Sequence, residues 1–444
     1  MFDISIGVFV LVGFVLILAG ILSGFPIAWI LGGIAVITGF LFWGPQSFDT
    51  FYQQMYGLVS NYILLAIPLF IFMGAMIEES GVGKRLFDTM YLIFGALRGG
   101  IAITVVVVGT MLATILGIIA GSTVMLTIVA LPNMLRHGYN KAMSCGTVCA
   151  SGSLGIFIPP SILLIIYGPV SGISVGKLFM GAFMPGFMLS GLYITYILIR
   201  SFLNPHDAPS IPAGEQAVSW GVKAKMFVTS ALPLLVLIFS VLGVIYTGIA
   251  APTEAAAMGA VASILVAAFY RRLNYPTLKS ASHRSFDATV MVIYTCIGAA
   301  MFQSIFMALG GGEYFTNVVL SAPGGKWGSF IVIMFIILVL GMFIPDIAII
   351  LIMVPLVTPI AETLGFHPIW FAMMVCLDLQ TSFMTPPYAQ AIFFLQGAAD
   401  PSLGITTGDI IRGVIPFILL IFVGIGLCVA FPQIVTWLPG TMIK

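Results

Sequence analysis

Residues 152–161 read GSLGIFIPPS and lie in a long apolar run, yet they hold two adjacent prolines, Pro159 and Pro160. Proline has no amide hydrogen and its ring clashes with the preceding turn, so the pair breaks any helix that contains it. In a lipid bilayer, broken backbone is tolerated only where protein buries it or where it lines a cavity. This stretch therefore predicts a membrane helix that is interrupted deep inside the protein.

A second stretch of the same kind, residues 381–387, reads TSFMTPP and also interrupts an apolar run. Two broken helices in matching places are typical of transporters that bind substrate between two structural repeats. The composition agrees, since 60% of the 444 residues are hydrophobic and 7% are charged, whereas a soluble domain has roughly 25% charged residues. The apolar runs reach about 20 residues, the length of a spanning helix. We therefore predict an all-α integral membrane protein.

When the sequence is shifted by 227 residues, the two broken stretches align, and so do several proline and glycine residues around them. The aligned positions are Pro132 with Pro359, Gly138 with Gly365, Gly83 with Gly310, and 159–160 with 386–387. We therefore predict two repeats, 1–222 and 223–444, each with five spans and one re-entrant hairpin. An odd number of spans makes the two repeats inverted relative to one another. The expected spans are 4–22, 26–43, 58–79, 142–168 and 178–200 with a hairpin at about 100–132, then 226–247, 253–270, 286–309, 369–395 and 412–432 with a hairpin at about 328–358.

The basic residues predict how the chain crosses the membrane, because Lys and Arg gather on the cytoplasmic side. With the N-terminus outside, only three of the sixteen Lys and Arg residues fall on the outer side, namely Lys177, Lys326 and Lys444. The loop 271–284 is basic, whereas its aligned counterpart, 44–57, has neither Lys nor Arg. Both termini are therefore expected outside. Residues 84–97 and 314–320 are predicted to be interfacial helices, residues 204–221 a linker, and residues 4–22 a retained span rather than a cleaved signal.

Several classes of function lack support in the sequence. The net charge of +1 does not indicate a basic surface that would bind nucleic acid. The nearest approach to a phosphate loop, GISVGK at 172–177, has the wrong spacing for nucleotide binding. The four histidines fall in expected loops and the five cysteines in apolar stretches, without metal-ligand spacing. We therefore predict that the protein is not an enzyme, and that a gradient rather than ATP drives transport.

Small polar residues gather at the predicted breaks. Backbone carbonyls that are freed at a helix break, together with Ser or Thr hydroxyls, are suitable ligands for Na⁺. Helix N-termini at the same breaks attract a carboxylate. The alternative is that glycine, serine and threonine only allow helices to pack closely. The first predicted cluster joins the tip of the first hairpin to the first break and contains Gly121, Ser122, Thr123, Ser153, Gly155 and Ser161. The second joins the tip of the second hairpin to the second break and contains Gly341, Asp346, Thr381, Ser382 and Thr385.

Polar residues also lie within the expected span at 369–395. Ionisable residues inside a membrane face a protein interior or a cavity. Asp378 could therefore help to bind a cation, a proton or a polar group of the substrate, or it could accept a hydrogen bond from a freed backbone amide. The candidates for substrate contact are Ser161, Asp378, Gln380 and Thr385.

At these residues the sequence resembles the large membrane subunit, of the DctM type, of tripartite ATP-independent periplasmic (TRAP) transporters. The matching stretches cover nearly the whole chain in order. They are 66–74 (AIPLFIFMG), 81–88 (GVGKRLFD), 121–122, 155–161 (GIFIPPS), 174–186 (SVGKLFMGAFMPG), 252–256 (PTEAA), 341–343 with Asp346, and 385–387.

The resemblance implies an elevator-type transport domain on a scaffold, Na⁺ coupling and an organic-acid substrate, in the inner membrane of a bacterium. It also implies two partners, a small DctQ-type membrane subunit and a soluble DctP-type binding protein in the periplasm; the small subunit is expected to be a separate chain. The first Na⁺ site would include Gly121, Ser122 and residues 153–160 with Pro159, and the second residues 341–346 and 381–387 with Pro386. Residues 378–388, DLQTSFMTPPY, depart from the common motif and resemble a subgroup linked to α-keto acids and other carboxylates.

Three other functions remain open from the sequence. A channel would show ion flux without saturable dependence on a substrate. A stand-alone inverted-repeat carrier of cations and carboxylates would need no binding protein. An intramembrane enzyme would need clustered histidine, aspartate or glutamate side chains, which the sequence does not show.

Overall fold

The computed structural model describes residues 6–117, 119–211 and 218–442, and within these ranges every regular element is helical. In the first half the helices are α1 (Ile6–Leu22), α2 (Ile27–Phe42), α3 (Ser47–Val59), η1 (Tyr62–Leu65), α4 (Ala66–Glu79), α5 (Val82–Phe94), α6 (Gly100–Leu116), α7 (Ile119–Arg136), α8 (Lys141–Ser153), η2 (Leu154–Ile156), α9 (Ile162–Ser171) and α10 (Val175–Leu203). In the second half they are α11 (Trp220–Ser230), α12 (Leu232–Tyr246), α13 (Pro252–Phe269), α14 (Tyr275–Ala308), α15 (Gly311–Leu320), α16 (Gly325–Gly341), α17 (Asp346–Thr363), α18 (Pro368–Ser382), α19 (Gln390–Ala398), η4 (Pro401–Leu403), α20 (Thr407–Ala430) and α21 (Gln433–Gly440).

Eight helical segments in the described part of the chain are long and apolar enough to cross a membrane. Many of their large apolar side chains face outward, for example Val236, Phe239 and Leu265. A soluble protein would bury such side chains, whereas lipid accepts them. The all-helical membrane fold expected from the sequence is confirmed. Of the expected first span and the linker, residues 4–5 and 212–217 lie outside the described residues.

Three expected boundaries are wrong. The segment 44–57 was expected to be a loop but contains most of α3 (Ser47–Val59). The sequence did not indicate this helix because α3 has no long apolar run. The basic loop 271–284 is shorter than expected, because α14 already begins at Tyr275. There Asn274 caps the helix by accepting a hydrogen bond from the amide of Thr277 at 2.8 Å.

The first hairpin turns at Gly117, not at residues 121–123, which belong to the first turns of α7. Gly117 has φ of +61°, a left-handed conformation that suits glycine.

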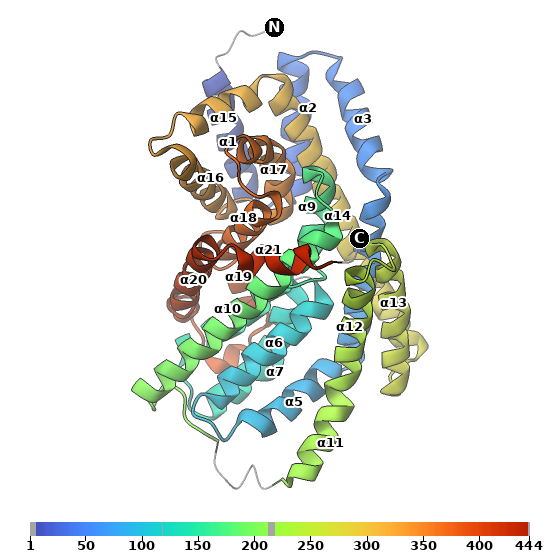
Figure 1. The fold of residues 1–444 in the computed structure, drawn as a ribbon, viewed down its shortest axis with the longest axis vertical. Coiled ribbons are helices and arrows are strands. Elements are labelled where there is room, and N and C mark those ends of the chain that lie inside the picture. The colour runs from blue at the N-terminus through green and yellow to red at the C-terminus, as the bar shows by residue number, and fades with distance from the viewer. Residues whose placement is uncertain (1–5, 118, 212–217, 443–444) are drawn as a thin grey trace.

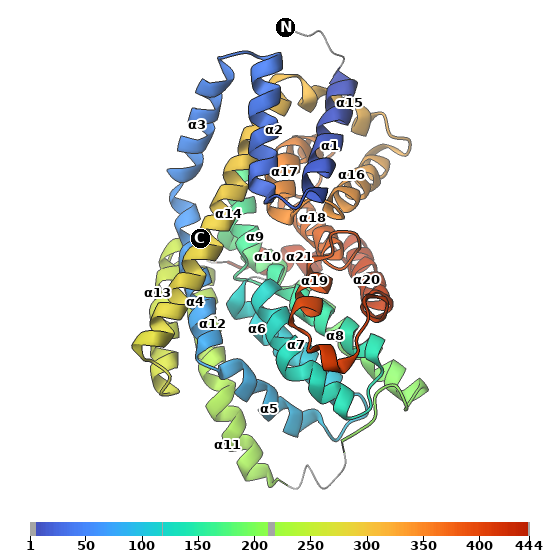
Figure 2. The ribbon, with the colours of Figure 1, turned by 180° about the vertical axis from the view of Figure 1, so that it is seen from behind.

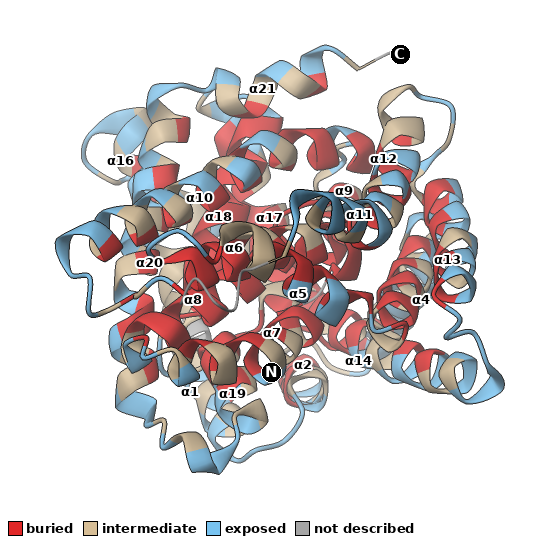
Figure 3. Ribbon diagram, turned by 90° about the horizontal axis from the view of Figure 1, so that it is seen from below, coloured by how far each residue is buried: buried red, intermediate tan, exposed pale blue. Residues whose placement is uncertain are grey.

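Both proline pairs interrupt a helix as expected. The first break separates α8 from α9, and the second separates α18 from α19. The peptide bonds Pro159–Pro160 and Pro386–Pro387 are cis. The helices that lead into the breaks are buried along almost their whole length, from Met143 in α8 and from Ile369 in α18, and they occupy the centre of the protein (Figure 3). The first break is thus buried in surrounding protein, as broken backbone in a membrane requires, whereas Pro386 and Pro387 of the second break are exposed.

The helices pack as two groups. In the first, which we call the α14 group, α14 packs against α2, α3 and α4, and α13 packs against α4. In the second, the hairpin group, α8 packs against α6, α7 and α20, while α19 packs against α7, α17 against α9, and α16 against α18. The two groups touch mainly where α14 meets α17 and where α4 meets α6. Figures 1 and 2 show α13 and α14 along one side of the protein and α20 on the other.

The helix bounds repeat at the same offset of 227 residues that aligned the sequence. Helix α7, shifted by 227, coincides with α17 at both ends. Contacts between the halves come in matching pairs, since α4 packs against α13 as α14 packs against α2, and α7 packs against α19 as α17 packs against α9. The division of the chain into two repeats stays a prediction, as does the opposite orientation of the two halves in the membrane.

A buried tyrosine fixes the start of the first hairpin. Tyr139, in the loop between α7 and α8, is 4% exposed, and its hydroxyl accepts a hydrogen bond from the amide of Ile101 at 3.1 Å. This amide lies in the first turn of α6, where no carbonyl of the helix can accept it. Burial raises the pKa of Tyr139 to about 12, so the hydroxyl stays protonated. The contact ties the beginning of α6 to the end of α7.

Candidate functional site

The tip of the first hairpin lies against the first break. The hydroxyl of Ser122 donates to the carbonyl of Gly152 at 2.9 Å and to that of Ile119 at 3.0 Å. Gly117, at the turn, lies so close to the break that an added Cβ would be 2.9 Å from the carbonyl oxygen of Pro160. The predicted meeting of tip and break is therefore present. The hydrogen bond to Gly152 places Ser122, a candidate for the first cation site, beside α8.

Thr123 supplies an unsatisfied oxygen at the same place. Its side chain is fully buried, and its Oγ1 has no hydrogen-bond partner among the described residues. The approach to α8 is close, because a Cβ added to Gly152 would overlap this oxygen and lie 2.9 Å from the Cα of Thr123. Buried hydroxyls are rarely left unpaired. An oxygen-seeking cation beside α7 and α8 would satisfy this one.

The remaining candidates around the first break are buried as well, including Gly155 and Pro159. Ser153 donates to the carbonyl of Ala150 at 2.9 Å and accepts a hydrogen bond from Gln380 Nε2 at 3.4 Å. Gly121 faces the α14 group instead, since an added Cβ would lie 3.4 Å from Oε2 of Glu78. The hairpin tip thus reaches both the broken helix and α4.

The second hairpin and the second break enclose a cavity of about 10 Å³. A buried cavity of roughly 10–15 Å³ can hold one water molecule, and Na⁺ is of similar size. Its polar lining comes from Asp346, Ser382, Tyr388 and Gln390, and Gly341 also lines it. The hydroxyl of Ser382 is buried and has no hydrogen-bond partner in the described part of the chain. A hydroxyl, a carboxylate and an amide around so small a space form a donor set that fits a hard cation.

The other candidates of the second cluster lie beside this cavity rather than in it. Thr381 donates to the carbonyl of Asp378 at 2.7 Å, and Thr385 donates to that of Thr381 at 2.8 Å. Pro386 is exposed. No group of three or more histidine, cysteine, aspartate or glutamate side chains converges within the described ranges. The oxygen donors are hydroxyls and the carbonyl of Gly152 at the first cluster, and the hydroxyl of Ser382 and the carboxylate of Asp346 at the second. Their assignment to Na⁺ stays a prediction.

A larger cavity, of about 780 Å³, lies between the hairpin group and the α14 group. Ligand sites commonly measure about 300–1,000 Å³. Four helices of the hairpin group begin at its wall, α7, α9, α17 and α19, with their first residues Ile119, Ile162, Asp346 and Gln390 all lining it. The opposite wall contains Asp287, Tyr294 and Thr295 of α14, together with Trp29 of α2. The cavity is thus bounded by both groups and by both breaks.

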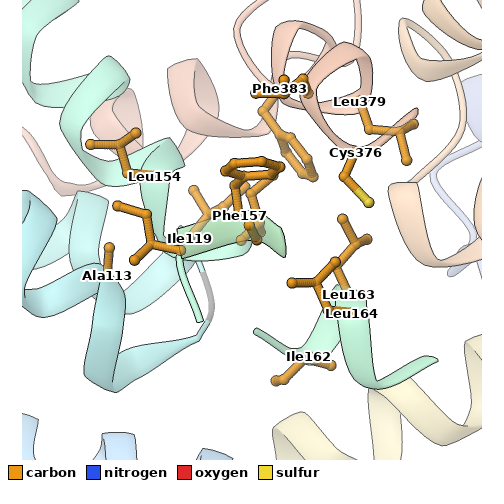
Figure 4. Packing of buried hydrophobic residues seen from close by; sticks show 14 of the residues in the cluster. Ala113, Ile119, Leu154, Phe157, Ile162, Leu163, Leu164, Cys376, Leu379 and Phe383 are labelled. Carbon is orange, nitrogen blue, oxygen red and sulfur yellow. The ribbon is translucent and has the colours of Figure 1, made fainter. Parts of the chain in front are cut away.

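Apolar side chains from both breaks meet beside this cavity. Figure 4 shows Phe157 of the first break and Phe383 of the second in one cluster with Ile119 and Leu154. Phe383 also lines both cavities. The packing joins the two breaks and the first hairpin into one body.

The predicted substrate residues do not line the larger cavity. Ser161, Asp378 and Gln380 are buried, and Ser161 donates to the carbonyl of Ile156. One oxygen of Asp378 and the amide oxygen of Gln380 have no hydrogen-bond partner among the residues described. These three residues are buried and are not part of the cavity lining, and Thr385 lies in the second break. Their role with substrate stays a prediction.

The lining includes polar residues that the sequence reasoning did not select, namely Asp287, Thr295 and Tyr388. Asp287 carried a usable signal, because it is an acidic residue within the expected span 286–309. Tyr388 directly follows the second proline pair, and Gln390, a polar residue within the expected span 369–395, comes two residues later. The turn of the chain after the proline pair brings both to the cavity.

A comparison with protein families identifies the architecture. Residues 14–434 match the family described as the DctM component of the tripartite ATP-independent periplasmic transporter. The chain belongs to this family. It is therefore a membrane subunit of a TRAP transporter, as the motifs indicated.

Curated relatives of the TRAP subunit match over nearly their full lengths. The C4-dicarboxylate TRAP transporter large permease protein of Vibrio cholerae is 30% identical, with 96% of each chain covered. The 2,3-diketo-L-gulonate permease of Escherichia coli is 27% identical, with 94% of this chain and 96% of the relative covered. The ectoine permease of Halomonas elongata is 28% identical, with the same coverage. The names of these relatives show that one subunit type serves chemically different substrates.

A solved structure has the same fold at low identity. The YdaH transporter of Alcanivorax borkumensis superimposes with a TM-score of 0.60 at 16% identity, covering 92% of this chain and 98% of that one. This likeness concerns the fold alone.

Proposed function

We propose that the protein is the large subunit of a Na⁺-coupled secondary transporter that imports a small carboxylate, such as an α-keto acid. One observation carries the proposal. Two hairpin tips meet two broken helices beside a shared cavity, and a buried hydroxyl without a partner lies at each meeting point, Thr123 at the first and Ser382 at the second.

The hydroxyls suit Na⁺ because hard cations prefer oxygen ligands. At the first meeting point Ser122, Thr123 and the carbonyl of Gly152 supply neutral oxygens. At the second, Ser382 and Asp346 supply a hydroxyl and a carboxylate. A cation bound at either point would link a hairpin to a broken helix and so stabilise their contact.

The helix N-termini suit a carboxylate. Each carries partial positive charge and free amides in its first turn. Helices α7, α9, α17 and α19 all begin at the wall of the larger cavity. Organic acids also appear in the names of relatives, as C4-dicarboxylate and 2,3-diketo-L-gulonate, which supports this class of substrate.

Alternating access in this proposal is a movement of the hairpin group against the α14 group, in the manner of an elevator. The hydrogen bond between Ser153 and Gln380 supports a two-fold relation within the hairpin group. These residues are separated by 227 positions, and residues related by a two-fold axis meet each other on that axis. The hairpin group would then be a single symmetric body.

The proposed assembly contains a DctQ-type small membrane subunit and a DctP-type periplasmic binding protein. It lies in the inner membrane of a bacterium with both termini of this chain in the periplasm. The basic helices α5 and α11 lie together at one end of the protein (Figure 1), which supports a cytoplasmic end there.

The test is uptake into proteoliposomes that contain both membrane subunits. We expect uptake only when the binding protein and external Na⁺ are both present, and loss of uptake when choline replaces Na⁺. Undiminished uptake in Na⁺-free medium driven by protons would overturn the coupling. Full uptake without the binding protein would instead identify a stand-alone carrier.

A further inference from the structure

The larger cavity has an unusual charge for a site that binds anions. Its ionisable lining includes two acidic residues, Asp287 and Asp346, and no Lys, Arg or His from the described part of the chain. Arg284, one turn before Asp287 on α14, is already paired with Glu78 at 2.7 Å and Glu79 at 3.6 Å. Within the described residues, no basic side chain is thus positioned to receive a carboxylate in the cavity.

The two acidic residues occupy different surroundings. Asp346 lines both the larger cavity and the 10 Å³ cavity beside the unpaired hydroxyl of Ser382. A cation in the small cavity would offset the charge of Asp346. Asp287 lines only the larger cavity, on the opposite wall, and has no ion-pair partner among the described residues. Its negative charge therefore remains when the small cavity is filled.

The groups that can receive a carboxylate are gathered on the wall opposite Asp287. They are the first turns of α7, α9, α17 and α19, together with the side chains of Tyr388 and Gln390. Much of the remaining lining is apolar and includes Ile71, Ile156, Leu163, Val292 and Phe394. One end of a ligand would meet amides and hydroxyls, while its other end would meet apolar side chains and Asp287.

We propose that the cavity selects a small monocarboxylate with an apolar or uncharged body, and that Asp287 rejects a second carboxylate. This inference rests on the proposed function and specifies its substrate class. Asp287 is exposed and water screens part of its charge, but a second carboxylate near it would have no basic partner in the described lining, and the two like charges would still repel. The Asp346 carboxylate contributes to selection only while the small cavity holds no cation.

The experiment measures binding to the purified complex of both membrane subunits, without the binding protein, so that the permease alone makes the choice. Thermal stabilisation in saturating Na⁺ is titrated with pairs of acids that differ by one terminal carboxylate: butyrate and succinate, 2-oxovalerate and 2-oxoglutarate, benzoate and terephthalate. We expect the monocarboxylate of at least one pair to bind at least tenfold more tightly than its partner, and no pair to show the reverse.

The variant Asp287→Asn should reduce this ratio at least threefold by tightening dicarboxylate binding. Asp287→Ser provides a second form of the same change. The control is Asp49→Asn, which removes an acidic residue from the first turn of α3 outside the cavity and should leave the ratio unchanged. An unchanged ratio in both Asp287 variants would overturn its role.

The remaining outcomes separate this inference from the proposed function. Tighter Na⁺-dependent binding of a dicarboxylate by the unmodified protein would overturn the monocarboxylate assignment and leave Na⁺-coupled carboxylate transport intact. Absence of binding by every acid, with and without Na⁺, would contradict both.

Discussion

The change Gly341→Ala tests the second cation site with a single methyl group. Gly341 ends α16 and lines the 10 Å³ cavity. A Cβ added there would overlap the hydroxyl of Ser382 and lie 2.6 Å from its Cβ. The methyl group would fill the small cavity and push away the unpaired hydroxyl, without removing any polar side chain.

The expected magnitude has two parts. Overpacking a tight contact typically destabilises by about 1–3 kcal/mol, while replacing glycine by alanine in a helix stabilises by roughly 0.5–1 kcal/mol. The Na⁺-free protein should therefore lose between roughly 0 and 2.5 kcal/mol. A ligand present at 100 times its Kd stabilises the folded state by about 2.7 kcal/mol. Loss of the second site removes this increment, so the variant should differ most from the unmodified protein at high Na⁺.

The assay is thermal unfolding of the purified membrane complex over a series of NaCl concentrations, with choline chloride holding ionic strength constant. Gly341→Ala should keep the part of the Na⁺-dependent stabilisation that belongs to the first site and lose the rest. Gly191→Ala in α10 is the matched control, because no described atom lies within 4 Å of an added Cβ there. It should retain the full Na⁺ response. A full response in Gly341→Ala would refute the assignment of the small cavity to a cation.

Four further predictions concern single side chains. Ser122→Ala, which removes the hydroxyl that joins α7 to Gly152, should raise the Na⁺ concentration required for half-maximal uptake; an unchanged requirement would remove Ser122 from the first site. Thr385→Ala, which removes the hydrogen bond from Thr385 to the carbonyl of Thr381 beside the small cavity, should also raise that concentration in the same uptake assay; an unchanged requirement would remove Thr385 from the second site. Tyr139→Phe leaves the buried amide of Ile101 without its acceptor and should destabilise the protein by about 1–3 kcal/mol in thermal unfolding, with Na⁺ dependence unaltered. Arg284→Gln breaks a pair whose arginine is 54% exposed, so its effect on stability should stay below about 1 kcal/mol.

The sequence predicted the features that depend on local backbone chemistry. Two proline pairs had to break their helices, and both do, between α8 and α9 and between α18 and α19. The composition predicted a helical membrane protein, and the motifs predicted the DctM family. These features follow from residue types that have few alternatives in lipid, because broken backbone must be buried in protein or line a cavity.

The parts that the sequence did not predict depend on packing and capping. The first hairpin turns at Gly117 because glycine adopts the left-handed conformation there, whereas several small residues nearby were equally plausible turning points. Helix α14 begins earlier than its apolar run because Asn274 caps it. Likewise, Asp287 and Asp346 both line the larger cavity, and no local sequence pattern indicates that these two residues share a site.

The central claim is that this subunit couples carboxylate entry to Na⁺ entry. Its most direct test is the entry of radioactive Na⁺ into proteoliposomes that contain both membrane subunits and receive substrate from the loaded binding protein. We predict that loaded binding protein stimulates Na⁺ entry in a fixed ratio to substrate entry, and that empty binding protein does not. Substrate uptake at the full rate without any accompanying Na⁺ entry would contradict the account.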